Sequence, residues 1–306
     1  MDDTTARLVD ALLTTARDRG LELRRESAVL DETGWDFRVL HGVDTGGARW
    51  ILRVPRRPDV AAAVDVEARL LALVRDRLPV AVPHWRIADR ELVAYPRLAG
   101  EPAASEDVVT FRLHWRIDRQ NPPQSYVEAL GRCMAALHAT PVEEAAATGI
   151  PVRRLDGVRA RFGEQLVLGR AELGMHDTWW GRGRRWLDDD ALWSPRSVLV
   201  HGDLHPGHTL VDDTGNLVGV LDWSDAEVGD PGTEFVEAAR KFEPSMLDDL
   251  LAAYAAHGGQ TWPGLARHVR EGIAFAPLTL GVLGLTSDQE RYVEAARARL
   301  GVLTHG

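Results

Sequence analysis

The stretch 200-VHGDLHPGHTLVDDTGNLVGVLDW-223 places three histidines and an aspartate between apolar runs. The runs 197–200 (SVLV), 209–211 (TLV) and 217–221 (LVGVL) have the length and branched side chains of buried strands, and DDTGN between the last two is typical of a turn. HGDLHPGH therefore lies on a loop that leaves a strand end, where a rigid scaffold usually holds reactive groups. Asp222 ends the next strand, so we expect it to lie beside the same loop.

Phosphoryl transfer needs these residue types. A hydroxyl nucleophile requires a carboxylate that orients it and accepts its proton, and Mg²⁺ beside a triphosphate requires a carboxylate and a neutral ligand. Asp203 suits the first role, and Asp222 with His208 suits the second. If the loop transfers a phosphoryl group, these residues would use Mg²⁺ as cofactor and a triphosphate as donor.

A zinc site is an alternative interpretation of the same loop. His201-Gly-Asp203-Leu-His205 has the alternating ligand spacing found in zinc hydrolases. Such sites need further ligands from separate strand ends, and the later histidines lie in helical or tail contexts. The spacing alone leaves both kinds of site open.

The bulk composition narrows the class of protein. The chain has 306 residues and 45% hydrophobic content, enough for two packed lobes. A net charge of −10 disfavours nucleic-acid partners, and no apolar run reaches the ~18 residues of a membrane span. The N-terminus is acidic and then amphipathic, unlike a signal peptide, and the single cysteine, Cys133, cannot form an internal disulfide. We expect a cytoplasmic protein that needs neither nucleic acid nor a membrane.

The order of the predicted elements indicates two parts. Hydrophobic periodicity predicts the elements in chain order as a helix over 4–19, strands over 35–41 and 49–54, a helix over 59–75 and a hairpin over 86–96. The chain is mostly helical from 125 onward. We therefore predict a sheet-rich N-lobe over 1–97, with one crossing helix, and a helical C-lobe over 98–306.

Three motifs together resemble one known family. HGDLHPGH, the following VLDW and 229-GDPGTEF-235 are similar to the aminoglycoside phosphotransferase family, a branch of the protein-kinase-like fold. Its catalytic loop reads HGD-x4-N, and its metal aspartate opens a D-W or D-F pair. The matching positions here are His201, Gly202, Asp203, Asp222 and Trp223. His208 departs from the family, since most members have asparagine there.

That histidine and the N-lobe segments resemble a subgroup, the macrolide 2′-phosphotransferases, over about residues 30–300. The resemblance implies an α+β, two-lobed protein-kinase-like fold with a small antiparallel sheet in the N-lobe. It implies a monomeric antibiotic-resistance enzyme that moves the γ-phosphate of GTP or ATP to the 2′-hydroxyl of a macrolide. Asp203 and His201 would be catalytic, and His208 and Asp222 would bind the metal.

A buried ion pair in the N-lobe supports this fold. On the predicted helix 59–75, Glu67 falls within an apolar stripe, where a carboxylate is costly to bury without a partner. Arg53, in the middle of the strand WILRV, is the natural partner. Lys241 is the only lysine and lies far along the chain, so we expect Arg53 to contact the phosphates if any residue of this strand does. A position of Glu67 at the solvent edge of the stripe is the alternative.

Two further segments are candidates for nucleotide binding. Gly34 is the only glycine of 29-VLDETGWDFRV-39, and the resemblance makes this turn a candidate phosphate-covering loop. In 94-AYPRLAG-100 the carbonyl of Pro96 and the N–H of Leu98 are expected to hydrogen-bond the base, with Tyr95 beside it. A strand end closed by proline explains Pro96 equally well.

The acceptor is inferred from charge and apolarity. Residues 101–190 hold 14 acidic residues against 12 arginines, and apart from 188-DDD-190 they lack the acidic cluster that a polycationic aminoglycoside needs. The apolar run 273–285 suits a macrolactone, and we expect Phe275 and Leu278 to line the pocket, with tryptophans such as Trp115 in the same lobe. A kinase for an aminoglycoside or small metabolite, and a nucleotide-binding protein without catalysis, remain alternatives.

Overall fold

The computed structural model describes residues 3–107 and 112–302, which pack into two compact units. Unit 1 is drawn from Met1–Ile117, Ala147–Ile150 and Pro206–Ser224, and unit 2 from Asp118–Ala146, Pro151–His205 and Asp225–Gly306. The lobe boundary that we predicted near residue 97 stays a prediction, because these units are defined by packing and reuse distant segments of the chain.

A five-stranded antiparallel sheet forms the first part of unit 1. Its order is β1 (Val29–Asp31), β2 (Phe37–Val43), β3 (Arg49–Pro55), β5 (Val93–Pro96) and β4 (Ile87–Ala88), and the short helix η1 (Arg25–Ser27) precedes it. The two hairpins expected from the sequence are both present.

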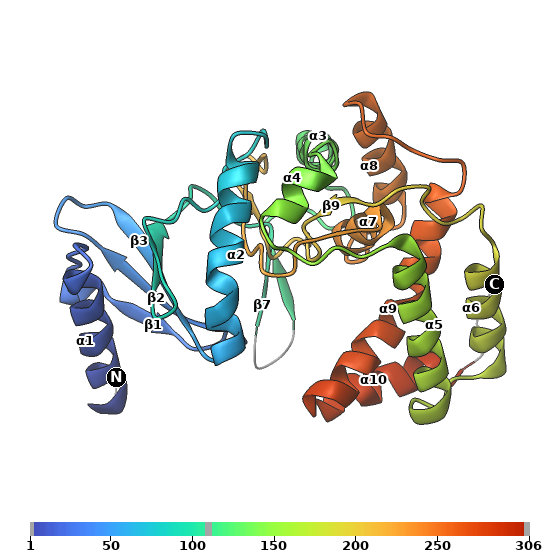
Figure 1. Cartoon of the computed structure of the whole chain (residues 1–306), viewed down its shortest axis with the longest axis horizontal. Helices are drawn as coiled ribbons and strands as arrows, with labels where there is room; N and C mark the ends of the chain where they lie inside the picture. The colour runs from blue at the N-terminus through green and yellow to red at the C-terminus, as the bar shows by residue number, and fades with distance from the viewer. Residues whose placement is uncertain (1–2, 108–111, 303–306) are drawn as a thin grey trace. The chain divides into compact units, whose positions relative to one another are not determined.

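One helix covers each face of this sheet (Figure 1). Because side chains alternate along a strand, Leu52 of β3 packs with α1 (Asp3–Asp18), while Ile51 packs with Val64 of α2 (Pro58–Arg75). The face toward α2 is the one that carries Arg53.

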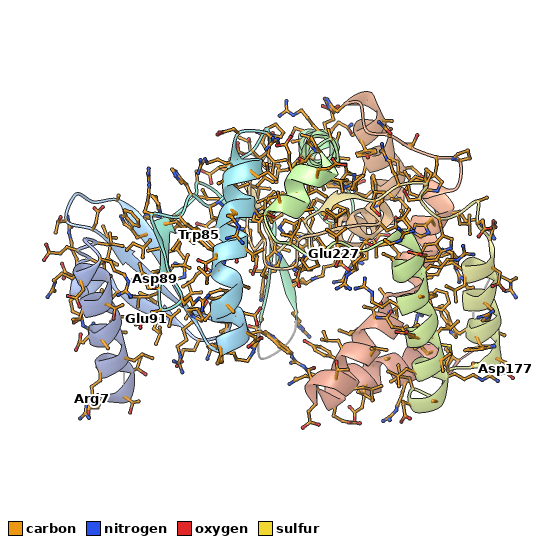
Figure 2. All side chains as sticks on the ribbon, in the orientation of Figure 1. Arg7, Trp85, Asp89, Glu91, Asp177 and Glu227 are labelled. Carbon is orange, nitrogen blue, oxygen red and sulfur yellow. The ribbon has the colours of Figure 1, made fainter. Side chains whose placement is uncertain are left out.

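Ion pairs anchor the end of α1 to the sheet. Arg19 lies 2.5 Å from a carboxylate oxygen of Asp89 and 2.6 Å from one of Glu91, both labelled in Figure 2. The side chain of Arg19 is only 24% exposed, so these pairs lie partly within the protein. They supplement the apolar contacts of α1.

Shorter strands complete unit 1. A three-stranded sheet has the order β11 (Leu217–Val220), β10 (Thr209–Val211) and β6 (Glu101–Pro102), and β7 (Ala104–Glu106) pairs with β8 (Leu113–Trp115). The sequence predicted β10 and β11 only, because strands of two or three residues carry too little alternation to be recognised. Trp115 thus belongs to unit 1, and not with the later tryptophans as we had expected.

Unit 2 is mainly helical. Its helices are α3 (Gln124–His138), most of α4 (Val142–Ala147), α5 (Leu155–Glu172), α6 (Asp177–Asp188), α7 (Pro231–Ala239), α8 (Ser245–Ala256), α9 (Leu265–Ser287) and α10 (Glu290–Leu300). A two-stranded sheet, β9 (Val198–Val200) with β12 (Glu227–Gly229), carries the loop of interest. An antiparallel N-terminal sheet followed by a helical region confirms the predicted α+β class.

The core of unit 2 corrects one expectation. Phe275 and Leu278 on α9 are 1% and 0% exposed, and Phe275 packs against Phe162 and Trp186. Such buried side chains cannot touch a ligand, so both are core residues and not pocket residues. Nearly every position along this part of α9 is apolar, and the sequence therefore could not indicate which face is buried.

By length and composition alone, α9 could also cross a membrane. The uninterrupted apolar run within α9 is, however, shorter than the ~18 residues that we took as the length of a membrane span. The helix nevertheless packs against α5, α7 and α10, and it carries a buried histidine, His268, paired with Asp230. Helices in the core of other proteins pass the same test, so this single helix is weak evidence for a membrane span.

Candidate active site

The loop after β9 is shaped by Gly202. The residue adopts φ +85°, and a Cβ there would lie 2.2 Å from the backbone oxygen of Asp225. Only glycine permits this turn at this close approach. The turn follows the buried strand β9 directly, so Asp203 is presented from a rigid element.

Side chains of the loop after β9 contact one another. His201 is 0% exposed, and its Nδ1 accepts a hydrogen bond of 3.3 Å from the N–H of Asp203. The Asp203 carboxylate is partly exposed and lies 3.6 Å from Nε2 of His205. The structure therefore places His201 behind the loop, where it can position Asp203 but cannot touch a substrate.

Glu234 of α7 supports the loop from within unit 2. Its Oε2 accepts a hydrogen bond of 2.5 Å from the N–H of His201, and the carboxylate also accepts one from the N–H of Gly202. The side chain is fully buried, and burial raises its pKa to about 8. Sequence reasoning missed this residue, although an acid beside Phe235 in a largely apolar helix was a usable signal.

His208 and Asp222 lie together in unit 1. The N–H of Leu221 donates to the carbonyl of His208 at 2.8 Å, and Nε2 of His208 lies 3.9 Å from Oδ2 of Asp222. Asp222 has φ +57°, a left-handed conformation that is costly for a residue with a side chain and is frequent at functional sites. A carboxylate and an imidazole at this separation are a donor set that suits a divalent cation.

Arg53 forms the expected ion pair. Its Nη1 lies 3.1 Å from Oε1 of Glu67, its Nη2 lies 3.6 Å from Oδ1 of Asp222, and its guanidinium stacks 3.9 Å above the ring of Phe37. Glu67 also accepts a hydrogen bond from the N–H of Trp223. One buried cation thus joins β3, α2 and the segment after β11.

Electrostatics keeps Arg53 charged. Burial opposes its charge, but the carboxylates of Glu67 and Asp222 outweigh burial, so that the pKa of Arg53 is raised. Burial raises the pKa of Glu67, and the cation of Arg53 counteracts this rise. A phosphate near Arg53 would meet a fixed guanidinium that cannot lose its proton.

A cavity of about 320 Å³ lies within unit 1 beside these groups. Its apolar lining consists of Val39, Ile51, Tyr95, Leu98, Leu210 and Leu221. Its polar lining includes Arg53, His208, Asp222, His41, Arg97 and Glu101. A cavity lined by both apolar and charged side chains suits a nucleobase with attached phosphates. Five of the predicted residues therefore line one cavity, and His41, Arg97 and Glu101 were missed by sequence reasoning.

The hydrogen bonds between β3 and β5 orient the backbone of the predicted base-binding segment 94–100. The N–H of Arg97 donates to the carbonyl of Arg49 at 2.8 Å. Because successive backbone groups of a strand point to opposite sides, the carbonyl of Pro96 and the N–H of Leu98 point away from β3. This orientation agrees with a role of both groups in binding a base, which stays a prediction.

Gly34 lies in the connection between β1 and β2. A Cβ there would come 2.7 Å from the carbonyl oxygen of Phe37, so the glycine permits a tight turn. Arg57 anchors this turn, with Nη1 at 3.2 Å from the carbonyl of Trp35 and Nη2 at 2.7 Å from Asp36. Gly34 is not among the residues that line the cavity.

Comparison with known proteins identifies the family. The model of the phosphotransferase enzyme family (APH) matches residues 28–268. The chain belongs to this family. It is therefore a phosphotransferase of the kinase-like type, and this family assignment replaces the zinc-hydrolase interpretation.

Relatives match nearly the whole chain. The protein is 40% identical to the macrolide 2′-phosphotransferase MphH from Brachybacterium faecium, with a TM-score of 0.86 over 97% of this chain and 99% of that one. It is 38% identical to a macrolide 2′-phosphotransferase type I, with a TM-score of 0.85 over 96% and 97%. It is 39% identical to the uncharacterized protein YcbJ of Bacillus subtilis (strain 168), over 96% of each chain.

More distant structures agree on the fold. An aminoglycoside phosphotransferase in complex with GDP and kanamycin has a TM-score of 0.75 over 96% of this chain and 97% of that one, at 19% identity. At this identity the likeness concerns the fold alone. The predicted kinase-like fold is thereby confirmed.

Proposed function

We propose that this phosphotransferase moves the γ-phosphoryl group of GTP or ATP to the 2′-hydroxyl of the amino sugar of a macrolide. The observation that carries the proposal is the similarity of about two residues in five, over almost the full length, to two macrolide 2′-phosphotransferases. Such an activity would confer resistance to macrolide antibiotics.

In the reaction, the bond between Pγ and the β,γ-bridging oxygen breaks, and a bond from the acceptor oxygen to Pγ forms. The acceptor proton passes to the carboxylate of Asp203, and the nucleoside diphosphate leaves. Asp203 is partly exposed on a loop fixed by Gly202 and Glu234, as a positioned base must be. His201 supports this loop through its ring.

The donor would lie in the cavity of unit 1. The base would occupy the part of the cavity near Tyr95 and Leu98, and Arg53 would contact the phosphates. Arg49 of β3 is hydrogen-bonded to Arg97 and so marks the end of β3 that lies beside the proposed base-binding segment. Arg53 lies four residues further along β3, which corresponds to roughly 13 Å. That span is long enough for a nucleoside with its first phosphates.

Asp222 and His208 would hold Mg²⁺. Both line the cavity, and their side chains offer one oxygen and one nitrogen ligand within 3.9 Å of each other. When bound, a divalent cation would neutralise charge on the triphosphate oxygens. The imidazole makes the site more tolerant of Mn²⁺ or Co²⁺ than a site built from oxygen alone.

An apolar stripe on α9 is the better candidate for macrolide contact. It lies opposite the buried face of the helix and consists of Ile273, Ala276, Pro277, Leu280 and Leu283. These side chains are half-buried, except that Leu283 is 47% exposed. The stripe replaces Phe275 and Leu278 in the proposal, since it lies on the accessible side of the same helix.

A substrate panel tests the proposal. Erythromycin, kanamycin and homoserine are each incubated with GTP and with ATP, and phosphorylated product is measured by mass spectrometry. We expect product from erythromycin and none from kanamycin or homoserine, with the Asp203→Ala variant as the inactive control. Phosphorylation of kanamycin or homoserine, with none of erythromycin, would instead favour the aminoglycoside or metabolite kinase.

A further inference from the structure

Two buried polar side chains, each with an unpaired atom, lie close together behind the catalytic loop. Oε1 of Glu234 and Nε2 of His138 have no hydrogen-bond partner among the described residues, and Nε2 lies 4.0 Å from Oε2 of Glu234. Their side chains are 0% and 1% exposed. An unpaired buried polar group costs about 1–3 kcal/mol, so two of them side by side require an explanation.

A single proton between the two side chains can give Nε2 of His138 a hydrogen-bond partner on the carboxylate of Glu234. If Nε2 of His138 carries hydrogen, it donates to an ionised Glu234. If Glu234 carries the proton, its hydroxyl donates to a bare Nε2. Hydrogen-bond distances of about 2.7–3.2 Å require the two side chains to approach by roughly 1 Å, a small side-chain adjustment.

Tyr254 allows His138 to take either form. Nδ1 of His138 lies 3.0 Å from the hydroxyl oxygen of Tyr254 on α8. A tyrosine hydroxyl can donate or accept, so it can donate to a bare Nδ1 or accept from a protonated one. The neutral ring can therefore change tautomer without losing this contact.

The surroundings keep the histidine neutral. The rings of Phe235 and Tyr254 pack edge-on against His138, and burial lowers the pKa of His138 to about 3. Burial raises the pKa of Glu234 to about 8, although its hydrogen bonds from the loop oppose the rise. Near pH 8, therefore, the group that changes charge is Glu234, and His138 only moves its proton between nitrogens.

The other titratable and charged groups that act on the pair are Cys133 of α3, Glu237 of α7, Arg196 before β9, Asp230 before α7, and Asp203 and His201 of the catalytic loop. Of these groups, His201 also donates a backbone hydrogen bond to Glu234, and so does the adjacent Gly202. Loss of the negative charge on Glu234 would weaken these two bonds, because bonds to an ionised acceptor are about twice as strong as neutral ones.

We propose that Glu234 and His138 are positioning residues that share a proton, so that ionised Glu234, with His138 as its Nε2–H donor, holds the catalytic loop in its active geometry. This inference rests on the proposed role of the loop in phosphoryl transfer. When Glu234 takes up a proton, His138 changes to the Nδ1–H tautomer, and the loop is held less firmly.

A second buried histidine in unit 2 provides an internal control. Nδ1 of His268 accepts from Nε1 of Trp186 at 3.1 Å, and its Nε2 lies 2.8 Å from Oδ2 of Asp230. Indole is a donor only, so His268 is fixed with hydrogen on Nε2. It should keep this tautomer as long as the hydrogen bond from Trp186 is present.

The direct test is ¹⁵N NMR of the histidine rings in the full-length wild-type protein across pH 6–10. Signals are assigned by their loss in His138→Gln and His268→Gln. We expect His138 to pass from the Nδ1–H to the Nε2–H form as pH rises through about 8, while His268 stays unchanged. One unchanging His138 tautomer over the whole range would overturn the inference.

Kinetics provides the second readout. Glu234→Gln keeps the shape and an acceptor oxygen but removes the charge, so we expect kcat to fall about tenfold and its rise with pH near 8 to disappear. The nucleotide Kd should not change, because the cavity lies in unit 1. His268→Gln should keep the pH-dependent rise. A Glu234→Gln variant with the wild-type pH profile would refute the link to catalysis.

The two readouts separate the inference from the proposed function. The NMR titration needs no turnover, so a protein that phosphorylates no macrolide still reports the tautomer. An active enzyme whose His138 never changes tautomer would refute the proposal that Glu234 and His138 share a proton. The phosphotransferase assignment would then remain valid. If Glu234→Gln failed to fold, the wild-type titration would still decide the point.

Discussion

Arg53 forms ion pairs with two carboxylates of the proposed nucleotide site, Glu67 and Asp222. Arg53→Met would leave Glu67 buried and unpaired, which should lower the free energy of unfolding by about 3–5 kcal/mol. Arg53→Lys keeps the charge but loses the guanidinium that reaches two carboxylates through separate nitrogens, so it should fold while its nucleotide Kd rises about tenfold. Denaturant unfolding and calorimetry measure the two effects. Equal stability of the Met and Lys variants would contradict this account of the pair.

The buried acid Glu234 should make stability depend on pH. Its pKa is about 8 in the folded protein, against 4.5 as the ordinary value. Between these values the unfolded chain releases a proton that the folded chain retains, so the free energy of unfolding decreases as pH rises. The slope is at most about 1.4 kcal/mol per pH unit. Urea unfolding across this range should show a flatter profile for Glu234→Gln, and parallel profiles would argue against a buried protonated acid.

His208 should influence the choice of metal. Imidazole nitrogen is a poor ligand for Mg²⁺ and a better one for Mn²⁺, whereas an amide oxygen suits Mg²⁺. His208→Asn should therefore raise the ratio of Mg²⁺-supported to Mn²⁺-supported activity several-fold. Rates with each metal at saturating concentration give this ratio. An unchanged ratio would remove His208 from the metal site and leave Asp222 as its only proposed side-chain ligand.

Single residues also mark the limits of sequence reasoning. Arg53 and Glu67 were predictable as a pair because a charge within an apolar run is costly unless it is matched. Phe275 and Leu278 were misplaced because α9 is apolar on nearly all faces, and hydrophobicity alone cannot separate a core face from a binding face. The partnership of Glu234 with the loop depends on contacts between elements far apart in the chain, which spacing does not encode.

At the scale of elements, the loop after β9 depends on its glycine. Gly202→Ala combines an unfavourable φ with a Cβ placed 2.2 Å from the Asp225 oxygen. Gly258 has the same φ of +85° in the same unit but nothing within 4 Å of the added Cβ. Gly258→Ala should cost only the strain of about 1–3 kcal/mol, while Gly202→Ala should also displace Asp203 and lower kcat at least tenfold. Similar activity in the two variants would mean that the close approach to Asp225 is unimportant.

The apolar stripe of α9 makes a separate prediction. Leu280→Glu should raise the KM for erythromycin about tenfold or more, because it places a charge on the proposed contact surface. The KM for nucleotide should be unaffected. Val167→Glu on α5 is the matched control, since Val167 is 59% exposed and lies outside the stripe. Initial rates at varied erythromycin concentration give the KM of each variant. Equal KM values in the two variants would mean that the macrolide binds elsewhere.

Elements differ in how well the sequence predicted them. The strands β2, β3, β9, β10 and β11 and the helices α1 and α2 follow from apolar runs or periodicity bounded by turns. The strands β6, β7 and β8 did not, because each has only two or three residues and is defined by its pairing partner. β6 pairs with β10, which lies more than a hundred residues later, and a local sequence pattern cannot predict such a distant contact.

At the scale of the whole molecule, the chain joins two units whose segments alternate along the sequence. The loop that begins as His201-Gly-Asp203 in unit 2 continues into unit 1 at Pro206, where His208 and Asp222 lie. Asp203, the proposed general base, therefore belongs to unit 2, whereas the proposed metal ligands His208 and Asp222 belong to unit 1. One short loop connects Asp203 to His208. Family membership and two full-length relatives with matching folds make phosphoryl transfer the common function of these parts.

The most direct test of the account is to locate the phosphate on the product. Erythromycin and GTP are incubated with wild-type protein and with Asp203→Ala, and the product is analysed by ³¹P NMR and mass spectrometry. We predict wild-type transfer to the 2′-oxygen, and in the variant a rate at least about 10²-fold lower with an unchanged nucleotide Kd. Phosphate at another position, or a variant that turns over at the wild-type rate, would contradict the account.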